Sequence, residues 1–327
     1  MTTPAFRPAS LDDAAVAADM MTAAYPPEPQ DPVVTRYRWM HPRLGWSTGR
    51  FIAELDARPI AYVGWFHGPW ASLPERQGYV ECALDRARWT TALATLLWDW
   101  ITQQATADGA LLINASAVDD QTKELEVLRS LGFRIDRRDQ AWELDLITHG
   151  PSLVADAHAA RDKMREAGIR LTTLASWNDP AALAKLHALH DLTIQDAPHT
   201  IPILAQTLED YTARMNAPDV PGERVWIALS GDRPVAISFL RFPPVRGQVW
   251  TGYTGCHPAF RGRGIARGVK LQSLAQAAEM KVPLVRTDND SENAPMLHIN
   301  EALGYRRRPG FVSLVKRVKG PADRSHL

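Results

Sequence analysis

Apolar and polar positions follow the same order in two stretches of the chain. The first stretch, "FRPASLDDAAVAADMMTAAY", has a short extended start, an Asp-rich turn and then apolar residues at helical spacing. A similar order recurs in "IRLTTLASWNDPAALAKLHALHD", which begins at Ile169. The pattern therefore predicts that each half of the chain opens with a strand followed by a helix.

Each opening is followed by a pair of β-rich segments. "RFIAELDARPIAYVGWFH" and "RVWIALSGDRPVAISFLRF" are apolar runs interrupted by a polar turn, "LDARP" or "SGDRP", and this is typical of a hairpin. Each half then closes on a helix stop, Leu131-Gly132-Phe133 or Leu303-Gly304-Tyr305. Glycine suits the left-handed position that ends a helix, so a strand is expected after each stop.

Repetition of this order favours a duplicated α/β unit, with chance matching of short pieces as the alternative. A chain of 327 residues is long enough to give each of two domains its own core. We expect a first domain at residues 1–147, a partly helical linker at 148–168 and a second domain at 169–320.

Charge and cysteine content narrow the classes of protein. The chain has 37 Lys and Arg residues and 37 Asp and Glu residues, so its net charge is zero. No overall electrostatic attraction to nucleic acid or anionic lipid is therefore expected. Two cysteines, Cys82 and Cys256, are too few for a disulfide framework or a four-cysteine zinc site. The chain shows no signal-peptide pattern and no apolar run of membrane-spanning length. We expect a cytoplasmic protein with no metal, nucleic-acid or membrane partner.

The stretch "HPAFRGRGIARGVKLQSLAQ" follows a strand, "GQVWTGYTGC", and continues as an apolar helical pattern. The first N–H groups of such a helix have no helical acceptor, and Gly262 and Gly264 allow an anion to approach them closely. Arg261 and Arg263 add charge at the rim. A diphosphate fits this corner, although neither the dinucleotide nor the P-loop fingerprint is present.

A basic strip for nucleic acid is the alternative interpretation of this stretch. It rests on four cations, Arg261, Arg263, Arg267 and Lys270. The net charge of zero and the lack of aromatic residues between these cations argue against it.

Neighbouring motifs make the corner more informative. "CHP" precedes it, Arg261, Gly264 and Ala266 fit the pattern Arg-x-x-Gly-x-Gly/Ala, and "SENAPMLHINEALGY" follows. This order resembles the GNAT superfamily of acyl-CoA-dependent N-acetyltransferases. The resemblance implies an α/β (α+β) fold of two tandem GNAT-like domains, a layout similar to that of mycothiol synthase. Each domain would have a mixed, mostly antiparallel sheet flanked by helices.

The same resemblance implies acetyl-CoA as the cofactor and assigns residues to it. The backbone of Cys256 and His257 would bind the pantetheine arm, and Asn293 would reach the same region. Backbone N–H groups from Arg261 to Ala266 would hold the pyrophosphate. The expected cofactor-binding residues are thus Cys256, His257, Arg261, Gly262, Arg263, Gly264, Ile265, Ala266 and Asn293. His257 is expected at the rim, without a role in proton transfer.

The first half lacks the glycine corner. If Cys82 is aligned with Cys256 without gaps, Thr90 stands opposite Gly264, and both glycines of the corner are missing. Trp89 would then fill the space that a phosphate needs. We expect a first domain with a degenerate cofactor motif, which is structural or supplies a wall of the substrate cleft.

Acetyl transfer to an amine requires a neutral nucleophile and a proton for the departing thiolate. The strand "QVWTGYTGC" carries no carboxylate that could act as a general base. At the position where GNAT enzymes often have a Tyr that acts as the general acid, this chain has Asn300. Tyr253 is our first choice for handling the proton or polarising the carbonyl, and Asn300 can donate a hydrogen bond. Because the usual base and acid are missing, a non-catalytic acyl-CoA sensor or regulatory protein is the alternative.

Substrate recognition in GNAT proteins comes from the segment after the first helix, here "HALHDLTIQDAPHTIPILAQ". His190, Asp191, Asp196 and His199 are the candidate substrate-binding residues, and a solvated loop is the alternative. Carboxylates there favour a cationic substrate. The expected activity is acetylation of a primary amine on a small molecule that resembles an aminoglycoside, a polyamine or an amino acid. Fused halves can mimic a dimer, so a monomer and a homodimer are both open.

Overall fold

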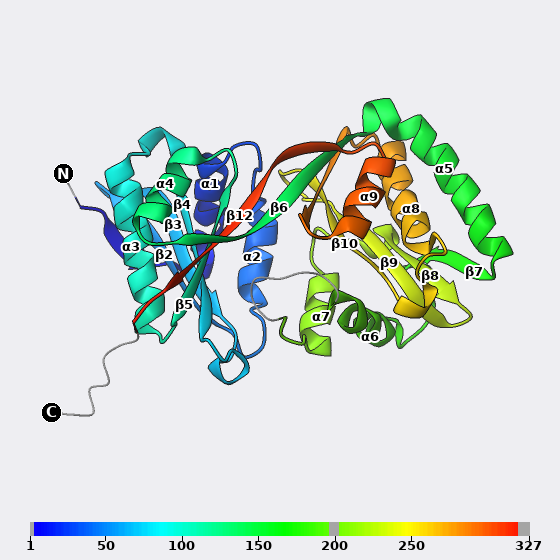
Figure 1. Cartoon of the computed structure of the whole chain (residues 1–327), viewed down its shortest axis with the longest axis horizontal. Helices are drawn as coiled ribbons and strands as arrows, with labels where there is room; N and C mark the ends of the chain where they lie inside the picture. Colours follow the sequence, from blue (N-terminus) through cyan, green and yellow to red (C-terminus); the bar gives the residue numbers. More distant parts are fainter. Residues whose placement is uncertain (1–2, 196–202, 320–327) are drawn as a thin grey trace. The chain divides into compact units, whose positions relative to one another are not determined.

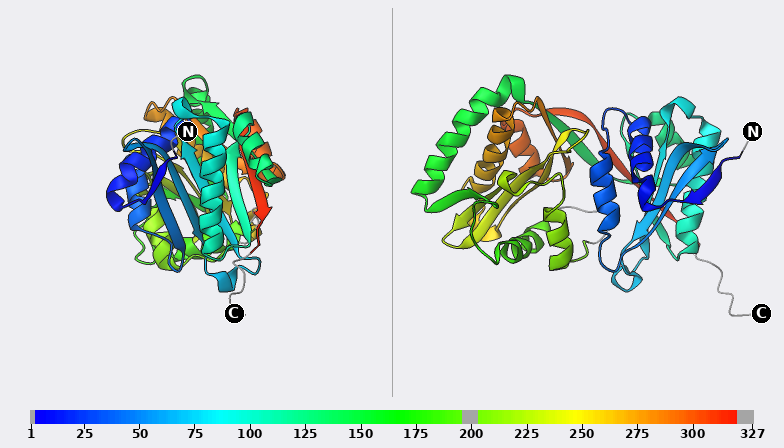
Figure 2. Two further views of the ribbon diagram at one scale, coloured as in Figure 1. Left: turned by 90° about the vertical axis from the view of Figure 1, so that its left-hand side faces the viewer. Right: turned by 180° about the vertical axis from the view of Figure 1, so that it is seen from behind.

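The computed structural model describes residues 3–195 and 203–319, which fall into two units (Figure 1). The first unit runs to Asp139 and takes in the chain from Pro309 onward. The second unit runs from Gln140 to Arg308, except for a short segment ending at Leu204 that belongs with the first. In each unit a mixed sheet has helices on both faces, so the expected fold class is confirmed (Figure 2).

The sheet of the first unit has the strand order β1-β2-β3-β4-β5-β12. These strands are β1 (Ala5–Pro8), β2 (Ser47–Leu55), β3 (Arg58–His67), β4 (Gln77–Leu84), β5 (Leu112–Val118) and β12 (Arg306–Arg317). Neighbours pair antiparallel except β4 and β5, which are parallel. The predicted β2–β3 hairpin is present, and Asp56 (φ 51°) and Ala57 (φ 57°) at its turn both adopt the left-handed conformation that suits a two-residue hairpin loop.

Four helices of the first unit cover the two faces of this sheet. They are α1 (Ala14–Ala24), α2 (Pro32–Met40), α3 (Thr91–Ala107) and α4 (Thr122–Ser130). Side chains alternate along a strand, so Tyr62 of β3 packs with Ala17 of α1, whereas Val63 packs with Leu97 of α3. Helices α1 and α3 therefore lie on opposite faces.

The second unit repeats this arrangement with the strand order β7-β8-β9-β10-β11-β6. Its strands are β6 (Arg134–Asp145), β7 (Ile169–Thr173), β8 (Val225–Ser230), β9 (Arg233–Arg241), β10 (Val249–Cys256) and β11 (Leu284–Asp290). Its helices are α5 (Leu146–Glu166), α6 (Ala182–Ile194), α7 (Leu208–Met215), α8 (Ile265–Glu279) and α9 (Ala294–Ala302). Gly132 (φ 89°) follows α4 and Gly304 (φ 86°) follows α9, which confirms both predicted helix stops.

The segment expected as a linker is mostly helix α5. Its residues Leu153 and Ala157 share an apolar cluster with Leu271 and Leu274 of α8. This burial makes α5 part of the second unit rather than a free connection.

Strands β6 and β12 each begin in one unit and end in the other. From Phe311 to Arg317, β12 pairs with β5 of the first unit, and β6 is the neighbour of β11 in the second. Glu143 of β6 holds this edge, since its Oε2 lies 3.1 Å from Arg286 Nε and 2.6 Å from Arg308 Nη1. The last strand of each half in sequence thus completes the sheet of the other half.

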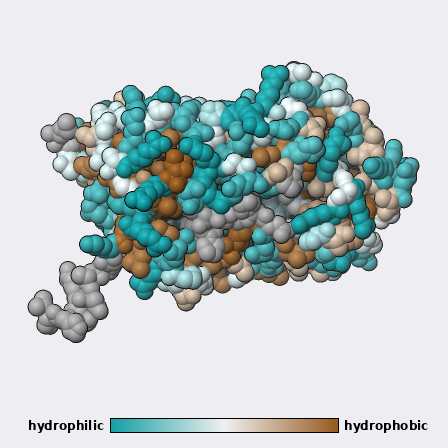
Figure 3. Space-filling view, in the orientation of Figure 1, coloured by the Kyte–Doolittle hydropathy of each residue, from teal (hydrophilic) through white to brown (hydrophobic). Residues whose placement is uncertain are grey.

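Hydrophilic side chains predominate on the face shown in Figure 3, and apolar residues form separate patches there. Large apolar side chains such as Trp98, Trp142 and Phe239 are buried instead, each at 1% exposure. No helix within residues 3–195 and 203–319 is both long and apolar enough to cross a membrane.

A lysine of α8 is buried in the core. Lys270 has no exposed surface, and its Nζ donates to Asn300 Oδ1 at 2.7 Å and lies 5.1 Å from the centre of the Tyr305 ring. No carboxylate among the described residues forms an ion pair with it. Burial disfavours the ammonium form and lowers the pKa of Lys270 from 10.5 to about 7. The basic-strip interpretation requires Lys270 to be exposed, and it is wrong on this residue.

We predict that Lys270→Met removes a pH dependence of stability from the second unit. The unfolded chain keeps this proton up to about pH 10.5, whereas the folded chain releases it above about pH 7. Unfolding takes up a proton between these values, so the free energy of unfolding rises with pH, by up to about 1.4 kcal/mol per pH unit. Urea unfolding at pH 7, 8 and 9 measures this slope. The exposed Lys163→Met is the control, and equal slopes in Lys270→Met and wild type would contradict the prediction.

Candidate functional site

The candidate site lies where the parallel strands β10 and β11 separate. They pair only at Val249 with Val285 and at Trp250 with Arg286. The opposite edge of β10 continues its pairing with β9 as far as Cys256. Backbone groups along the inner edge of β10 are therefore left facing a wedge, where a ligand can satisfy them.

A glycine turn connects the end of β10 to α8. Gly262 (φ 73°) and Gly264 (φ 78°) both adopt the left-handed conformation, which costs other residues about 1–2 kcal/mol. A Cβ at either position would meet no atom within 4 Å, so the turn is open on that side. Gly264 is also the N-cap of α8 and offers no capping side chain. The first N–H groups of α8 are thus exposed to an anion, as expected from the sequence.

The two arginines of this turn are held against its backbone. Arg261 Nε donates to the carbonyl of Cys256 at 3.1 Å, and Arg263 Nη2 donates to the carbonyl of Ala259 at 3.3 Å. Arg263 also lies over the ring of Phe260, 5.2 Å from its centre. Both side chains therefore brace the turn and add positive charge next to its N–H groups.

His257 caps the short 3-10 helix Pro258–Phe260. Its Nδ1 accepts a hydrogen bond from the N–H of Ala259 at 3.1 Å, and its Nε2 lies against the guanidinium of Arg233. Burial and the charges of Arg233 and Arg261 lower the pKa of His257, so its ring is neutral at neutral pH. A neutral capping residue agrees with the rim position expected for it.

Three further cofactor-binding candidates already have structural roles, in the core or at a helix end. Cys256 is 8% exposed and Ile265 is 2% exposed, and both belong to an apolar cluster behind the turn. Burial raises the pKa of the Cys256 thiol, which keeps it protonated. Asn293 is the N-cap of α9, where its Oδ1 accepts from the N–H of Met296 at 3.4 Å.

Tyr253 of β10 is surrounded by polar groups of α6 and α7. Its Oη lies 2.8 Å from Thr193 Oγ1, and its ring centre lies 5.0 Å from that of His190. Arg214 donates from Nη1 to His190 Nε2 at 3.1 Å, and its Cζ lies 6.0 Å from the centre of the Tyr253 ring. The structure thus brings together one catalytic candidate and one substrate candidate, Tyr253 and His190.

Other substrate candidates are placed differently. Asp191 is half-exposed on α6, and its Oδ2 lies 3.1 Å from His187 Nε2. Asp196 and His199 lie outside the described residues. Sequence reasoning missed Thr193 and Arg214. Thr193 is one helical turn after His190 on the pattern of α6, whereas nothing in the sequence connects Arg214 with this cluster.

Asn300 does not face the wedge. It has no exposed surface, its Oδ1 accepts from Lys270, and its Nδ2 donates to Asn289 Oδ1 at 2.7 Å. Both polar atoms of the amide are therefore used inside the core. This geometry favours a structural role for Asn300 over contact with a departing thiolate.

The first unit has a different turn at the corresponding position. Strand β4 ends at Leu84, and α3 begins after Thr90, whose Oγ1 accepts from the N–H of Leu93 at 3.2 Å. Leu84 rather than Cys82 therefore corresponds to Cys256, and the ungapped alignment is wrong at the strand because the turn before α3 is shorter. The capped N-terminus of α3 leaves less backbone for an anion than that of α8.

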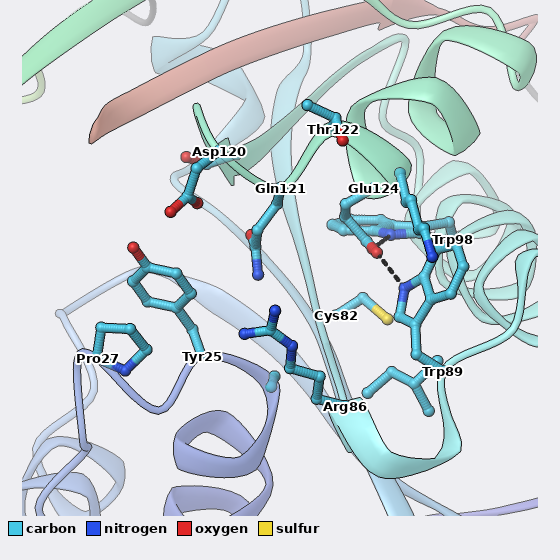
Figure 4. Close-up of a pocket in the computed structure, with 14 residues that line it drawn as sticks. Tyr25, Pro27, Cys82, Arg86, Trp89, Trp98, Asp120, Gln121, Thr122 and Glu124 are labelled. Atoms are coloured by element: carbon cyan, nitrogen blue, oxygen red, sulfur yellow. Dashed lines mark hydrogen bonds between the residues drawn. The ribbon is translucent and has the colours of Figure 1, made fainter.

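Trp89 does not fill the whole of this region. A cavity of about 420 Å³ remains beside it, near the ends of β4 and β5, which pair only from Gln77 to Tyr79. Trp89 and Trp98 both donate to the carboxylate of Glu124, while Arg86 and Gln121 point into the space from opposite sides (Figure 4). The first unit thus keeps a cavity between its diverging strands but lacks the glycine turn.

This chain has the fold of the tandem GNAT acetyltransferases, as its two units and their diverging parallel strands indicate. No protein-family model and no curated protein sequence matches it. Among solved structures it is similar to a tandem GNAT protein from the clavulanic acid biosynthesis pathway, with a TM-score of 0.75 and 16% identity over 98% of this chain and 100% of that one.

Two further solved structures have the same fold. A GCN5-related N-acetyltransferase from Sphaerobacter thermophilus matches with a TM-score of 0.65 and 18% identity, over 97% of each chain. A glucosamine N-acetyltransferase region in a fungal multi-domain beta-N-acetylglucosaminidase matches with a TM-score of 0.66 and 14% identity, over 96% of this chain and 38% of that one. At these identities the likeness establishes the fold.

We predict that His257 titrates below the ordinary histidine value of 6.5 and that Arg233→Gln raises the midpoint. Burial lowers the pKa of His257, and the charges of Arg233 and Arg261 lower it further, so removing the charge of Arg233 should raise it. Imidazole NMR signals followed from pH 4 to 8 measure the midpoint. Arg170→Gln, at another exposed arginine of the second unit, should leave it unchanged, and no shift in Arg233→Gln would refute the assignment.

Proposed function

We propose that this chain is an acetyl-CoA-dependent N-acetyltransferase whose second unit acetylates the primary amine of a small molecule. The acceptor class is aminoglycoside-like, polyamine-like or amino-acid-like. The observation that carries the proposal is the open glycine turn at the N-terminus of α8, placed where β10 and β11 separate. The tandem GNAT fold supports acyl transfer as the reaction class.

The residues of the turn fit a diphosphate. The N–H groups from Arg261 to Ala266 would hold it, because both glycines leave the approach open and no side chain caps α8. The inner edge of β10 at Cys256 and the backbone of His257 would bind the pantetheine arm, with Asn293 nearby at the start of α9. Acetyl-CoA, when bound, supplies the activated acetyl thioester.

Proton handling falls to Tyr253 in this proposal. Strand β10 carries no carboxylate, so the acceptor amine must arrive neutral or give its proton to a neutral group. Thr193 holds the Tyr253 hydroxyl at 2.8 Å and fixes its direction, which would let it hydrogen-bond the reacting carbonyl or share the proton of the amine. Asp191, half-exposed at the same end of α6, would favour a cationic substrate.

A non-catalytic acyl-CoA sensor is the second candidate. The burial of Asn300 favours it, because this removes one of the two polar groups expected at the reacting centre, the one that would donate a hydrogen bond. Both candidates require the same cofactor site, so cofactor binding tests what they share and turnover distinguishes them.

We predict that Gly264→Val weakens acetyl-CoA binding at least about tenfold. A β-branched residue is strained at φ 78° and would place its side chain beside the N–H groups that hold the diphosphate. Isothermal titration calorimetry measures the affinity. Gly231→Val is the matched control, since Gly231 (φ 59°) is equally open but lies in the β8–β9 hairpin turn. Equal affinity in Gly264→Val and wild type would remove the basis of the proposal.

We predict that Tyr253→Phe lowers kcat about 10²-fold and leaves acetyl-CoA affinity unchanged, because only the hydroxyl is lost. Free thiol release is followed across polyamines, aminoglycosides, amino acids and acylated cysteine conjugates. Tyr211→Phe, at a buried neighbour of His190, is the control. If no acceptor raises the rate of thiol release above that of slow acetyl-CoA hydrolysis, the sensor proposal is favoured over the enzyme proposal. If Tyr253→Phe turns over normally, another group handles the proton.

A further inference from the structure

Three residues form a straight row across the first unit's sheet, on the face covered by α1. Arg50 of β2 pairs directly with Gly64 of β3, and Gly64 pairs directly with Glu81 of β4. Directly paired residues point to the same side of a sheet. Arg50 and Glu81 therefore face the same space from two sides, and the glycine between them contributes no side chain.

Gly64 lets the side chains of Tyr62 and Glu81 meet directly over the sheet. A Cβ at Gly64 would lie 2.8 Å from Tyr62 Oη and 2.9 Å from Glu81 Oε1, closer than real Cβ contacts. The corresponding row of the second unit is different, because Phe239 of β9 pairs there with Val225 and Tyr253. A large ring thus occupies the position that the Tyr62 hydroxyl and the Glu81 carboxylate share in the first unit.

A cavity of about 430 Å³ lies over the row. This volume is within the range of small-molecule sites. Its wall includes the aromatic residues Trp39 and Trp46, and it carries Arg38 and Arg43 besides Arg50. Arg50 lies against Trp39, with its Cζ 4.9 Å from the ring centre. All of the lining residues belong to the first unit, so this cavity is separate from the glycine turn beside α8.

The two charged groups of the row differ in sign and act on each other. Glu81 Oε1 accepts from Tyr62 Oη at 2.6 Å, while no hydrogen bond to Oε2 occurs within the described part of the chain. Burial raises the pKa of Glu81, and the charges of Arg50 on β2 and Arg38 on α2 lower it. A carboxylate with one unused oxygen and a guanidinium stacked on an indole are thus presented to one cavity.

We propose that this cavity binds a small aminocarboxylate with an aromatic or apolar body. Arg50 would take the carboxylate, Glu81 would take the ammonium, and Trp39 would pack against the body. A simple anion would leave Glu81 facing a like charge, and a simple cation would do the same at Arg50, so the row selects a molecule that carries both charges. The proposal does not depend on the activity of the second unit.

The test compares three probes that share one aromatic ring: free phenylalanine, phenethylamine and 3-phenylpropionate. Calorimetry on the full chain should show free phenylalanine binding at least about tenfold more tightly than either single-charge probe. Glu81→Gln should remove its advantage over 3-phenylpropionate, and Arg50→Gln its advantage over phenethylamine. Gly64→Phe, which copies Phe239, should abolish binding of all three.

Controls separate loss of the site from loss of the fold. Arg58→Gln, an exposed arginine on β3, should bind like wild type. The thermal midpoint and the acetyl-CoA affinity of each variant report whether the chain remains folded. Glu81→Gln keeps the size of the side chain and Arg50→Gln introduces no larger group, so both test the proposal even if Gly64→Phe fails to fold. Equal binding of free phenylalanine and 3-phenylpropionate, or no binding of any probe to wild type, would overturn the proposal.

Discussion

An α-helix leaves its first backbone N–H groups without an acceptor, and the residues before the helix decide what those groups meet. In the second unit the preceding residue is Gly264, which has no side chain and holds the chain in the left-handed conformation. In the first unit it is Thr90, whose hydroxyl satisfies one of the groups. The same strand-turn-helix order therefore leaves the helix end without a side-chain cap in one unit and caps it in the other.

Differences at corresponding strand positions divide the two units further. Phe239 of the second sheet corresponds to Gly64 of the first, where the neighbouring carboxylate of Glu81 takes the space of the ring. The residue on the next strand is Tyr253 in the second unit and Glu81 in the first. The wedge between diverging parallel strands is retained in both. The two units thus share a backbone plan, while single side chains differ at corresponding positions of the two sheets.

Local features of this fold could be predicted from the sequence because they depend on neighbouring residues. The hairpins, both helix stops and the turn from Arg261 to Gly264 are of this kind. The register between strands could not be predicted from the sequence, so the row formed by Arg50, Gly64 and Glu81 was not predicted. The burial of Lys270 could not be predicted for a related reason. Its position on α8 is compatible with a polar face as well as with a buried one, and it is the contact with Asn300 of α9 that places it in the core.

The exchange of β6 and β12 has a consequence for how the protein is made. The outer edge of β5 is covered only by residues from Phe311 to Arg317, which leave the ribosome after nearly all of the second unit. Until then the nascent first unit carries an unpaired strand edge, which is a template for pairing with other chains. The sheet of the first half is therefore complete only once β12 has been made.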